Sequence, residues 1–279
     1  MQPEQATESR DEYVLGRTSE EYRRLRMQAL ALEPATRRVL QQVGLREGMS
    51  CLDVGCGTGE VMRLMSEFVG PSGSVTGLDC DGRLGSEAAE VLRATRKSQF
   101  RFIECDLESV EEPEGQPFDV TYARLVLIHV RDPLAVLRKM YAWTRPGGCI
   151  VVQDFDMRTI GLYPKFGTWG EFERVVFGVF GRAGKDVDIG YRLPAYFAEA
   201  GLGVPEGTDV AGFLMSLEQA RPMFLAVYTS LLPTALELGI TTEAESASFL
   251  REIEEAAAGE LYYSAFWPLL IGVWKRKPG

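Results

Sequence analysis

A run of alternating glycines after a short apolar segment is the part of this sequence best suited to chemistry. It reads Cys51-Leu52-Asp53-Val54-Gly55-Cys56-Gly57-Thr58-Gly59. Glycine lets the backbone approach a ligand where any Cβ would collide with it. A second apolar segment, 74–78, ends in Asp79, where a carboxylate can accept hydrogen bonds from both hydroxyls of a ribose. Together these two segments predict a site for a nucleoside-bearing ligand.

The spacing of the glycines argues against a dinucleotide as that ligand. The dinucleotide fingerprint is G-x-G-x-x-G, and its last glycine lets a helix pack on a strand. Here Glu60 takes that place, and the glycine comes one residue earlier. A carboxylate at a helix N-terminus would also repel a pyrophosphate, which needs this positive end.

Length and composition narrow the class of protein. The chain has 279 residues, 46% of them hydrophobic and 25% charged, which predicts a soluble globular protein of one large domain with or without a lid. A formal net charge of −10 without a long basic run disfavours a nucleic-acid partner. No apolar run approaches the ~20 residues of a membrane span, and residues 1–10 lack the apolar core of a signal peptide. We therefore expect a cytoplasmic protein without a membrane span.

The five cysteines have no metal-ligand spacing, so we expect reduced thiols and no metal.

Strands and helices are expected to alternate through the first half of the chain. Strands are predicted at 50–54, 74–79, 100–104, 118–122 and 149–153, with helices at 59–69, 84–96 and 133–144. This spacing favours a parallel sheet covered on both faces. Outside this region, helices are predicted at 18–45, 168–182, 192–200, 216–238 and 242–258, and strands near 205–214 and 262–275. Pro34 is expected to begin a new helix, and Pro268 to mark a strand edge or bulge.

Five ordered motifs carry a family resemblance over about residues 20–275. They are 53–59, Asp79, Glu104-Cys105-Asp106-Leu107, 118–130, and the stretch from Leu137 to Gly148. The chain resembles a class I S-adenosylmethionine-dependent methyltransferase of the small-molecule type, close to the ubiquinone/menaquinone-biosynthesis-like group. This resemblance implies an α/β, Rossmann-like fold with a seven-stranded, mostly parallel sheet, helices on both faces and a helical lid. The organisation expected is an N-terminal helical cap at 1–45 and a core at 46–279, with lid segments at about 160–185 and 216–258.

The resemblance also implies a cofactor, S-adenosyl-L-methionine, with S-adenosyl-L-homocysteine as product. In this family Asp79 would bind the ribose and Asp106 the adenine amino group. The further cofactor-binding residues expected are Tyr13, Gln28, Asp53, Gly55, Cys56, Gly57, Gly59, Cys80, Leu107 and Arg124. Structural roles are the alternatives: Asp79 could cap a helix, Asp106 could cap a turn, and Arg124 could pair with an acid.

Catalysis of methyl transfer needs an aligned nucleophile, and a base where that nucleophile carries a proton. His129, the only histidine, lies just beyond the 118–122 strand. Similar enzymes carry two histidines in this loop, but here Ile128 replaces the first. Asp154 follows the 149–153 strand at the sheet edge where ligands bind. We expect His129 to act as base and Asp154 to orient it; the alternatives are loop stabilisation by His129 and capping by Asp154.

Aromatic and apolar side chains outside the sheet region predict a small, largely apolar or aromatic acceptor. They are Tyr163, Phe166, Trp169, Phe172 and Phe177 in one segment and Phe213, Met215, Met223, Phe224 and Tyr228 in the other. Such stripes at helical spacing could equally form a core. Three other functions stay open: a cofactor-binding protein that catalyses a cyclisation or pericyclic step, methylation of a protein or tRNA, and a non-catalytic cofactor-sensing or interaction role. A monomer or homodimer is expected.

Overall fold

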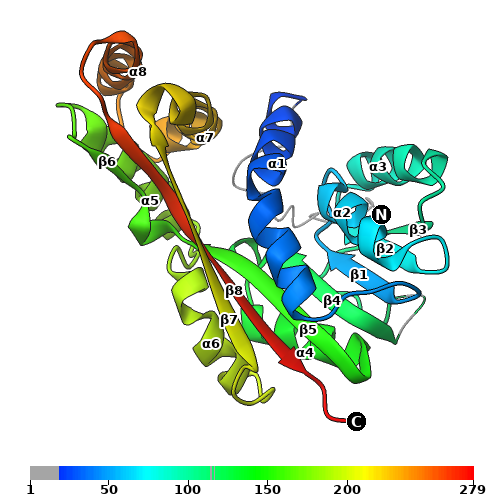
Figure 1. Cartoon of the computed structure of the whole chain (residues 1–279). Helices are drawn as coiled ribbons and strands as arrows, with labels where there is room; N and C mark the ends of the chain where they lie inside the picture. Colours follow the sequence, from blue (N-terminus) through cyan, green and yellow to red (C-terminus); the bar gives the residue numbers. More distant parts are fainter. Residues whose placement is uncertain (1–18, 114, 116) are drawn as a thin grey trace, which may run out of the picture.

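One mixed sheet organises the chain. The computed structural model describes residues 19–113, 115 and 117–279. The strands follow the order β3-β2-β1-β4-β5-β8-β6, and β7 pairs with the remaining edge of β8 (Figure 1). Their bounds are β1 (Ser50–Val54), β2 (Ser74–Asp79), β3 (Gln99–Glu104), β4 (Phe118–Arg124), β5 (Thr144–Asp156), β6 (Gly161–Tyr163), β7 (Gly207–Ser216) and β8 (Ser264–Arg276). The first five strands pair in parallel, whereas β6 and β7 run antiparallel to β8, as does β5.

Helices cover both faces of this sheet. They are α1 (Ser19–Gln42), α2 (Glu60–Val69), α3 (Gly82–Ala94), α4 (Pro133–Trp143), α5 (Trp169–Arg182), α6 (Ile189–Glu199), α7 (Leu217–Glu237) and α8 (Glu243–Ala258). Strand side chains alternate between two cores, since Cys51 and Val75 pack with α2 while Leu52 and Leu78 pack in the core that contains α4. Among the described residues, none of the helices combines the length and apolarity needed to cross a membrane.

The sheet has one strand more than the seven predicted, because β6 follows a single 3-10 turn (Met157–Thr159) after β5. Three residues are too few to show an alternating pattern in the sequence. The bulge expected at Pro268 is confirmed, since the β7–β8 register shifts between Ala211 and Phe213, which leaves two β8 residues opposite Gly212. Proline lacks the N–H that a regular ladder would use there.

The prediction that Pro34 begins a new helix is wrong, because Pro34 lies inside a continuous α1. Proline removes one hydrogen bond, to the carbonyl four residues earlier. That carbonyl belongs to Leu30, which is half exposed, so water can take the place of the lost donor. Burial of the apolar face on both sides of Pro34, at Leu32 and Val39, keeps the two halves of the helix in line.

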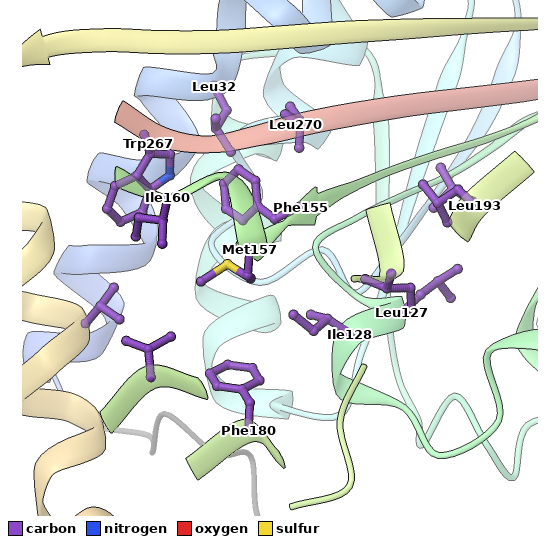
Figure 2. Packing of buried hydrophobic residues seen from close by; sticks show 14 of the residues in the cluster. Leu32, Leu127, Ile128, Phe155, Met157, Ile160, Phe180, Leu193, Trp267 and Leu270 are labelled. Atoms are coloured by element: carbon purple, nitrogen blue, oxygen red, sulfur yellow. The ribbon is translucent and has the colours of Figure 1, made fainter. Parts of the chain in front are cut away.

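The segments predicted as a lid pack on one another beyond the end of the sheet. Figure 1 shows α5, α7 and α8 grouped around the far ends of β6 and β8. Their aromatic rings form one cluster, in which the Phe224 ring lies 5.2 Å from those of Trp169 and Phe172 and 5.4 Å from that of Trp267. Figure 2 shows the adjoining core, where Phe155 and Met157 lie between Leu32 and Leu270 on one side and Ile128 and Phe180 on the other. Five of these aromatic residues therefore belong to a hydrophobic core, the alternative left open by the sequence, namely Phe166, Trp169, Phe172, Phe224 and Tyr228, whereas Tyr163 is 78% exposed.

Candidate active site

A cavity of about 290 Å³ opens at the carboxyl ends of β1, β2, β3 and β4. This is the edge of an open α/β sheet where ligands bind, and the volume is at the lower end of the range for small-molecule pockets. Ten of the fourteen site residues predicted from the sequence line it: Gln28, Gly55, Cys56, Gly57, Asp79, Cys80, Asp106, Leu107, Arg124 and His129. Asp53, Gly59 and Asp154 lie outside the lining, and Tyr13 lies outside the described residues.

Two of the motif glycines border the cavity, each for its own steric reason. Gly55 has φ +68°, and a Cβ there would come within 2.4 Å of the Val126 side chain. Gly57 has φ +48°, and a Cβ there would meet no atom within 4 Å. Gly55 therefore allows the loop to pass close to Val126, whereas Gly57 leaves open space beside the backbone in which a ligand can approach.

Gly59 has a packing role instead. It is the N-cap of α2 with φ +74°, and a Cβ there would lie 2.9 Å from that of Ala88 on α3. A side chain at this position would push α2 and α3 apart. The third glycine of the motif is thus needed for helix packing, a role that the glycine spacing alone does not distinguish from ligand contact.

Asp79 is held at the cavity wall by main-chain donors. Its Oδ2 accepts a hydrogen bond from Gly57 N (2.8 Å) and its Oδ1 accepts one from Asp81 N (2.9 Å). These bonds tie the carboxylate to the glycine loop and to the start of α3. Each carboxylate oxygen has a second lone pair for a ligand hydroxyl. On the neighbouring strand end, Asp106 accepts from Glu108 N (2.9 Å) and also faces the cavity.

Asp53 lies under the glycine loop rather than in the cavity wall. It is 2% exposed, and its Oδ2 has no hydrogen-bond partner among the described residues. Burial raises its pKa to about 8, although the positive charge of Arg124 acts in the opposite direction. Arg124 itself lines the cavity, and its Nη1 donates to Thr36 Oγ1 on α1 (2.9 Å). A buried carboxyl therefore lies beneath the glycine loop, while the neighbouring cation forms part of the cavity wall.

The raised pKa of Asp53 gives a pH-dependent prediction for Asp53→Asn. Because this pKa is about 8 in the folded chain and roughly 3.9 in an unfolded one, the carboxyl lowers stability as pH rises from about 4 to about 8. The neutral amide avoids this loss, so we expect the free energy of unfolding to rise by roughly 1–3 kcal/mol at pH 8. At pH 4, where the native carboxyl is protonated, urea denaturation should show no gain. A gain of equal size at both pH values would contradict this account.

His129 ends the short turn Leu127–His129 and lines the cavity. Lys185 Nζ donates to its carbonyl oxygen (2.6 Å), and its ring centroid lies 6.3 Å from that of Phe180. Burial, aided by the positive charges of Lys185 and Arg24, lowers its pKa to about 3. The imidazole is therefore neutral at physiological pH. It can accept a hydrogen bond from a ligand, but it is a much weaker base than an exposed histidine.

Asp154 lies beneath the same turn and is fully buried. Its Oδ2 accepts a hydrogen bond from Ile128 N (3.2 Å) and its Oδ1 accepts one from Phe155 N (2.9 Å). Burial raises its pKa to about 7. Its hydrogen bonds go to main-chain groups and not to the imidazole that it was expected to orient. Asp154 thus fixes the backbone that carries His129, which is the capping alternative.

The lowered pKa of His129 can be measured directly, because it is the only histidine in the chain. We expect its imidazole C2 proton signal in NMR spectra to stay constant from pH 8 to about pH 5, and to titrate near pH 6.5 in the urea-unfolded chain. Since the pKa is lower when folded, this residue's contribution to stability is complete above about pH 6.5 and declines as pH falls towards 3. A native-state midpoint near 6.5 would contradict the buried, neutral imidazole.

Several lining residues were missed by the sequence analysis. Tyr22, Leu25, Ala29 and Leu32 contribute one face of α1, and their spacing of three and four residues is the signal that could have identified them. Leu125 lines the cavity with φ 57°, a strained conformation for leucine that sequence does not reveal. Lys185 comes from the loop after α5, and only the folded chain brings it to His129.

All of the cavity-lining residues lie within the range matched by a known family model. The model, described as a methyltransferase domain, matches residues 20–195. Demethylmenaquinone methyltransferase of Staphylococcus aureus strain JH9 is 29% identical over 144 residues, which cover 51% of this chain and 58% of that protein. The chain therefore spans less than two thirds of the length of the curated relatives it matches.

Two solved structures show the same fold at low sequence identity. A protein from Bacillus halodurans superposes with a TM-score of 0.57 at 17% identity, over 88% of this chain and 99% of that one. Phosphoethanolamine N-methyltransferase 2 of Haemonchus contortus gives a TM-score of 0.52 at 16% identity, over 88% of this chain and 53% of that one. Since the family model covers more than half of the sequence, the chain belongs to the methyltransferase domain family and has its class I, Rossmann-like fold.

Proposed function

We propose that this chain transfers the methyl group of S-adenosylmethionine to a small, largely apolar or aromatic metabolite. The observation that carries the proposal is the single cavity that brings the open backbone at Gly57 together with the carboxylates of Asp79 and Asp106 and the imidazole of His129. Each of these groups comes from the end of a different strand or its following loop. Their convergence is what a nucleoside-bearing methyl donor and a second reactant would require in one chamber.

The residues present fit this cofactor. Asp79 offers acceptor lone pairs to the ribose hydroxyls, and Asp106 offers a carboxylate to the adenine amino group. The space beside Gly57 accommodates a chain passing close to the backbone. When bound, the cofactor supplies a methyl group already activated by a positively charged sulfur. The acidic wall is compatible with that charge, whereas it would disfavour a pyrophosphate.

The acceptor would enter beside the β4 end of the cavity. This region combines apolar side chains from α1 and from the loop after β4, including Leu25, Leu32, Val126 and Val130. His129 and Lys185 add a neutral hydrogen-bond acceptor and a cation. The α1 helix would cap the chamber, as the predicted N-terminal cap would do. This lining favours an apolar ring with one polar or acidic group, and the similarity to a demethylmenaquinone methyltransferase supports a quinone-type or related acceptor.

The test is an acceptor screen with the purified protein and methyl-labelled S-adenosylmethionine. We expect label in one or more apolar phenols or quinols, and none in bulk tRNA or a peptide mixture. The product S-adenosylhomocysteine should appear in equal amount. Label incorporated into tRNA or protein alone would overturn the small-molecule assignment. Cofactor binding without transfer to any acceptor class, but with cyclisation of a polyene substrate, would favour the non-methylating alternative.

A further inference from the structure

Two cysteines stand side by side in the cavity wall. The parallel register of β2 and β3 ends with Asp79 opposite Glu104, and Cys80 and Cys105 are the first residues beyond the two strands. The main-chain hydrogen bond from Cys105 N to Asp79 O (3.0 Å) holds the two chains side by side at this position. Neighbouring strands lie about 4.7–4.9 Å apart, within the range of about 4.4–6.8 Å for the Cα atoms of a disulfide.

Both cysteines of the pair also border the same cavity. Cys80 and Cys105 both line the cavity, each directly after the end of its strand. Both are in the thiol form, Cys80 exposed and Cys105 half-buried. Cys51 and Cys149, by contrast, are buried in β1 and β5 and do not reach the cavity.

We propose that Cys80 and Cys105 form a reversible disulfide in the cavity wall. We also propose that the disulfide weakens cofactor binding and that bound cofactor slows formation of the disulfide. The second statement rests on the proposed function, because the pair separates Asp79 from Asp106, the two carboxylates assigned to the cofactor. A disulfide would draw the two strand ends together and fix that spacing. A bound cofactor would cover the thiols.

The reaction needs a two-electron oxidant, and a peroxide supplies it. The exposed Cys80 thiolate attacks one peroxide oxygen, which gives a sulfenic acid and, from hydrogen peroxide, a hydroxide that takes up the proton released by the thiol and becomes water. The Cys105 thiolate then attacks the sulfenic sulfur and expels the hydroxide, which leaves as a second water once protonated. In total two thiols and one hydrogen peroxide give one disulfide and two waters.

The charges around Cys105 affect the rate of the second step, in which the disulfide forms. Burial, together with the negative charges of Asp106 and Asp79, raises the pKa of Cys105 to about 11. The thiolate is the reactive form, so the second step should accelerate with rising pH across the range 7–9. The nearby ammonium of Lys139 acts in the opposite direction, as a smaller influence. A slow thiol pair of this kind would respond to sustained oxidation.

The experiment treats the full chain with hydrogen peroxide and maps disulfides by mass spectrometry of non-reduced peptides. We expect one Cys80–Cys105 linkage that dithiothreitol reverses, and none in Cys80→Ser or Cys105→Ser. Cys149→Ser is the matched control and should form the linkage normally. Absence of the linkage at pH 9, or a Cys56–Cys105 linkage in its place, would overturn the assignment.

The coupling to the cofactor is measured separately. Saturating S-adenosylhomocysteine should slow the linkage at least about tenfold, and the oxidised chain should bind S-adenosylhomocysteine at least about tenfold more weakly than the same sample after reduction. If the linkage forms but the affinity is unchanged, the proposed effect of the disulfide on cofactor binding is refuted, whereas the proposed disulfide is confirmed. If the reduced chain binds no S-adenosylhomocysteine, the proposed function fails, while the peptide map still decides whether the pair forms.

Discussion

Replacing Asp79 with alanine is expected to weaken binding of S-adenosylhomocysteine by about a hundredfold or more. Each hydrogen bond to a charged group contributes roughly 1.5–3 kcal/mol, and tenfold in affinity corresponds to about 1.4 kcal/mol. The side chain also positions the glycine loop, through its bond to Gly57 N, and the start of α3, through its bond to Asp81 N. Removal of the side chain would therefore both eliminate its hydrogen bonds to the ligand and leave the glycine loop and the start of α3 less well positioned. Isothermal titration calorimetry of the folded variant measures the loss.

Two further variants make this result interpretable. Asp79→Asn retains one acceptor oxygen, so its affinity should fall between those of the wild type and the alanine variant. Asp209→Ala removes a carboxylate that pairs with Arg38 outside the cavity, and it should leave the affinity within about twofold. An alanine variant at position 79 that is folded and binds as tightly as the wild type would exclude this carboxylate from the site.

Replacing Phe224 with alanine is expected to destabilise the chain by about 3–5 kcal/mol. The side chain is fully buried, and its ring contacts those of Trp169, Phe172 and Trp267. Truncation would leave a cavity at the centre of the cluster that joins α5, α7 and β8. Urea denaturation measures the change in the free energy of unfolding. Tyr163→Ala is the matched control, because this ring is 78% exposed and its loss should change stability by only about 0.5 kcal/mol.

The Phe224 variant also distinguishes a core from an acceptor chamber. Phe224 is absent from the lining of the cavity. Below the unfolding transition, we therefore expect Phe224→Ala to bind S-adenosylhomocysteine within about twofold of the wild type. A large loss of affinity in a folded variant would mean that the aromatic cluster forms part of the binding site after all.

The core strands and the nucleoside end of the site follow from local sequence. The parallel strands are short and carry apolar residues, in alternation with polar ones in β3, and the ligand groups lie at or just beyond the strand ends, as Asp79 and Asp106 do. A residue that comes at the end of a predicted parallel strand is therefore expected at the carboxyl edge of the sheet, where the ligand binds. Gly55 and Gly57 were identified for the same reason, since positive φ and close backbone approach both favour glycine.

The acceptor end could not be predicted in this way, because residues distant in sequence build it. Lys185 reaches His129 from 56 residues further along the chain. Asp154 follows the expected strand at the expected edge, yet the Leu127–His129 turn packs over it, and Ile128 N of that turn donates to its carboxylate. The aromatic residues of α5 and α7 show helical periodicity whether their face meets a ligand or another helix. Only packing reveals that Trp169 and Phe224 meet each other.

The most direct test of the central claim is calorimetric titration of the wild-type chain with S-adenosylhomocysteine and, in parallel, with a nicotinamide dinucleotide. We predict binding of one S-adenosylhomocysteine per chain and no detectable binding of the dinucleotide. Binding of the dinucleotide alone by folded protein would contradict the assignment of this cavity. Binding of neither ligand would likewise leave the fold without the methyl-donor site proposed here.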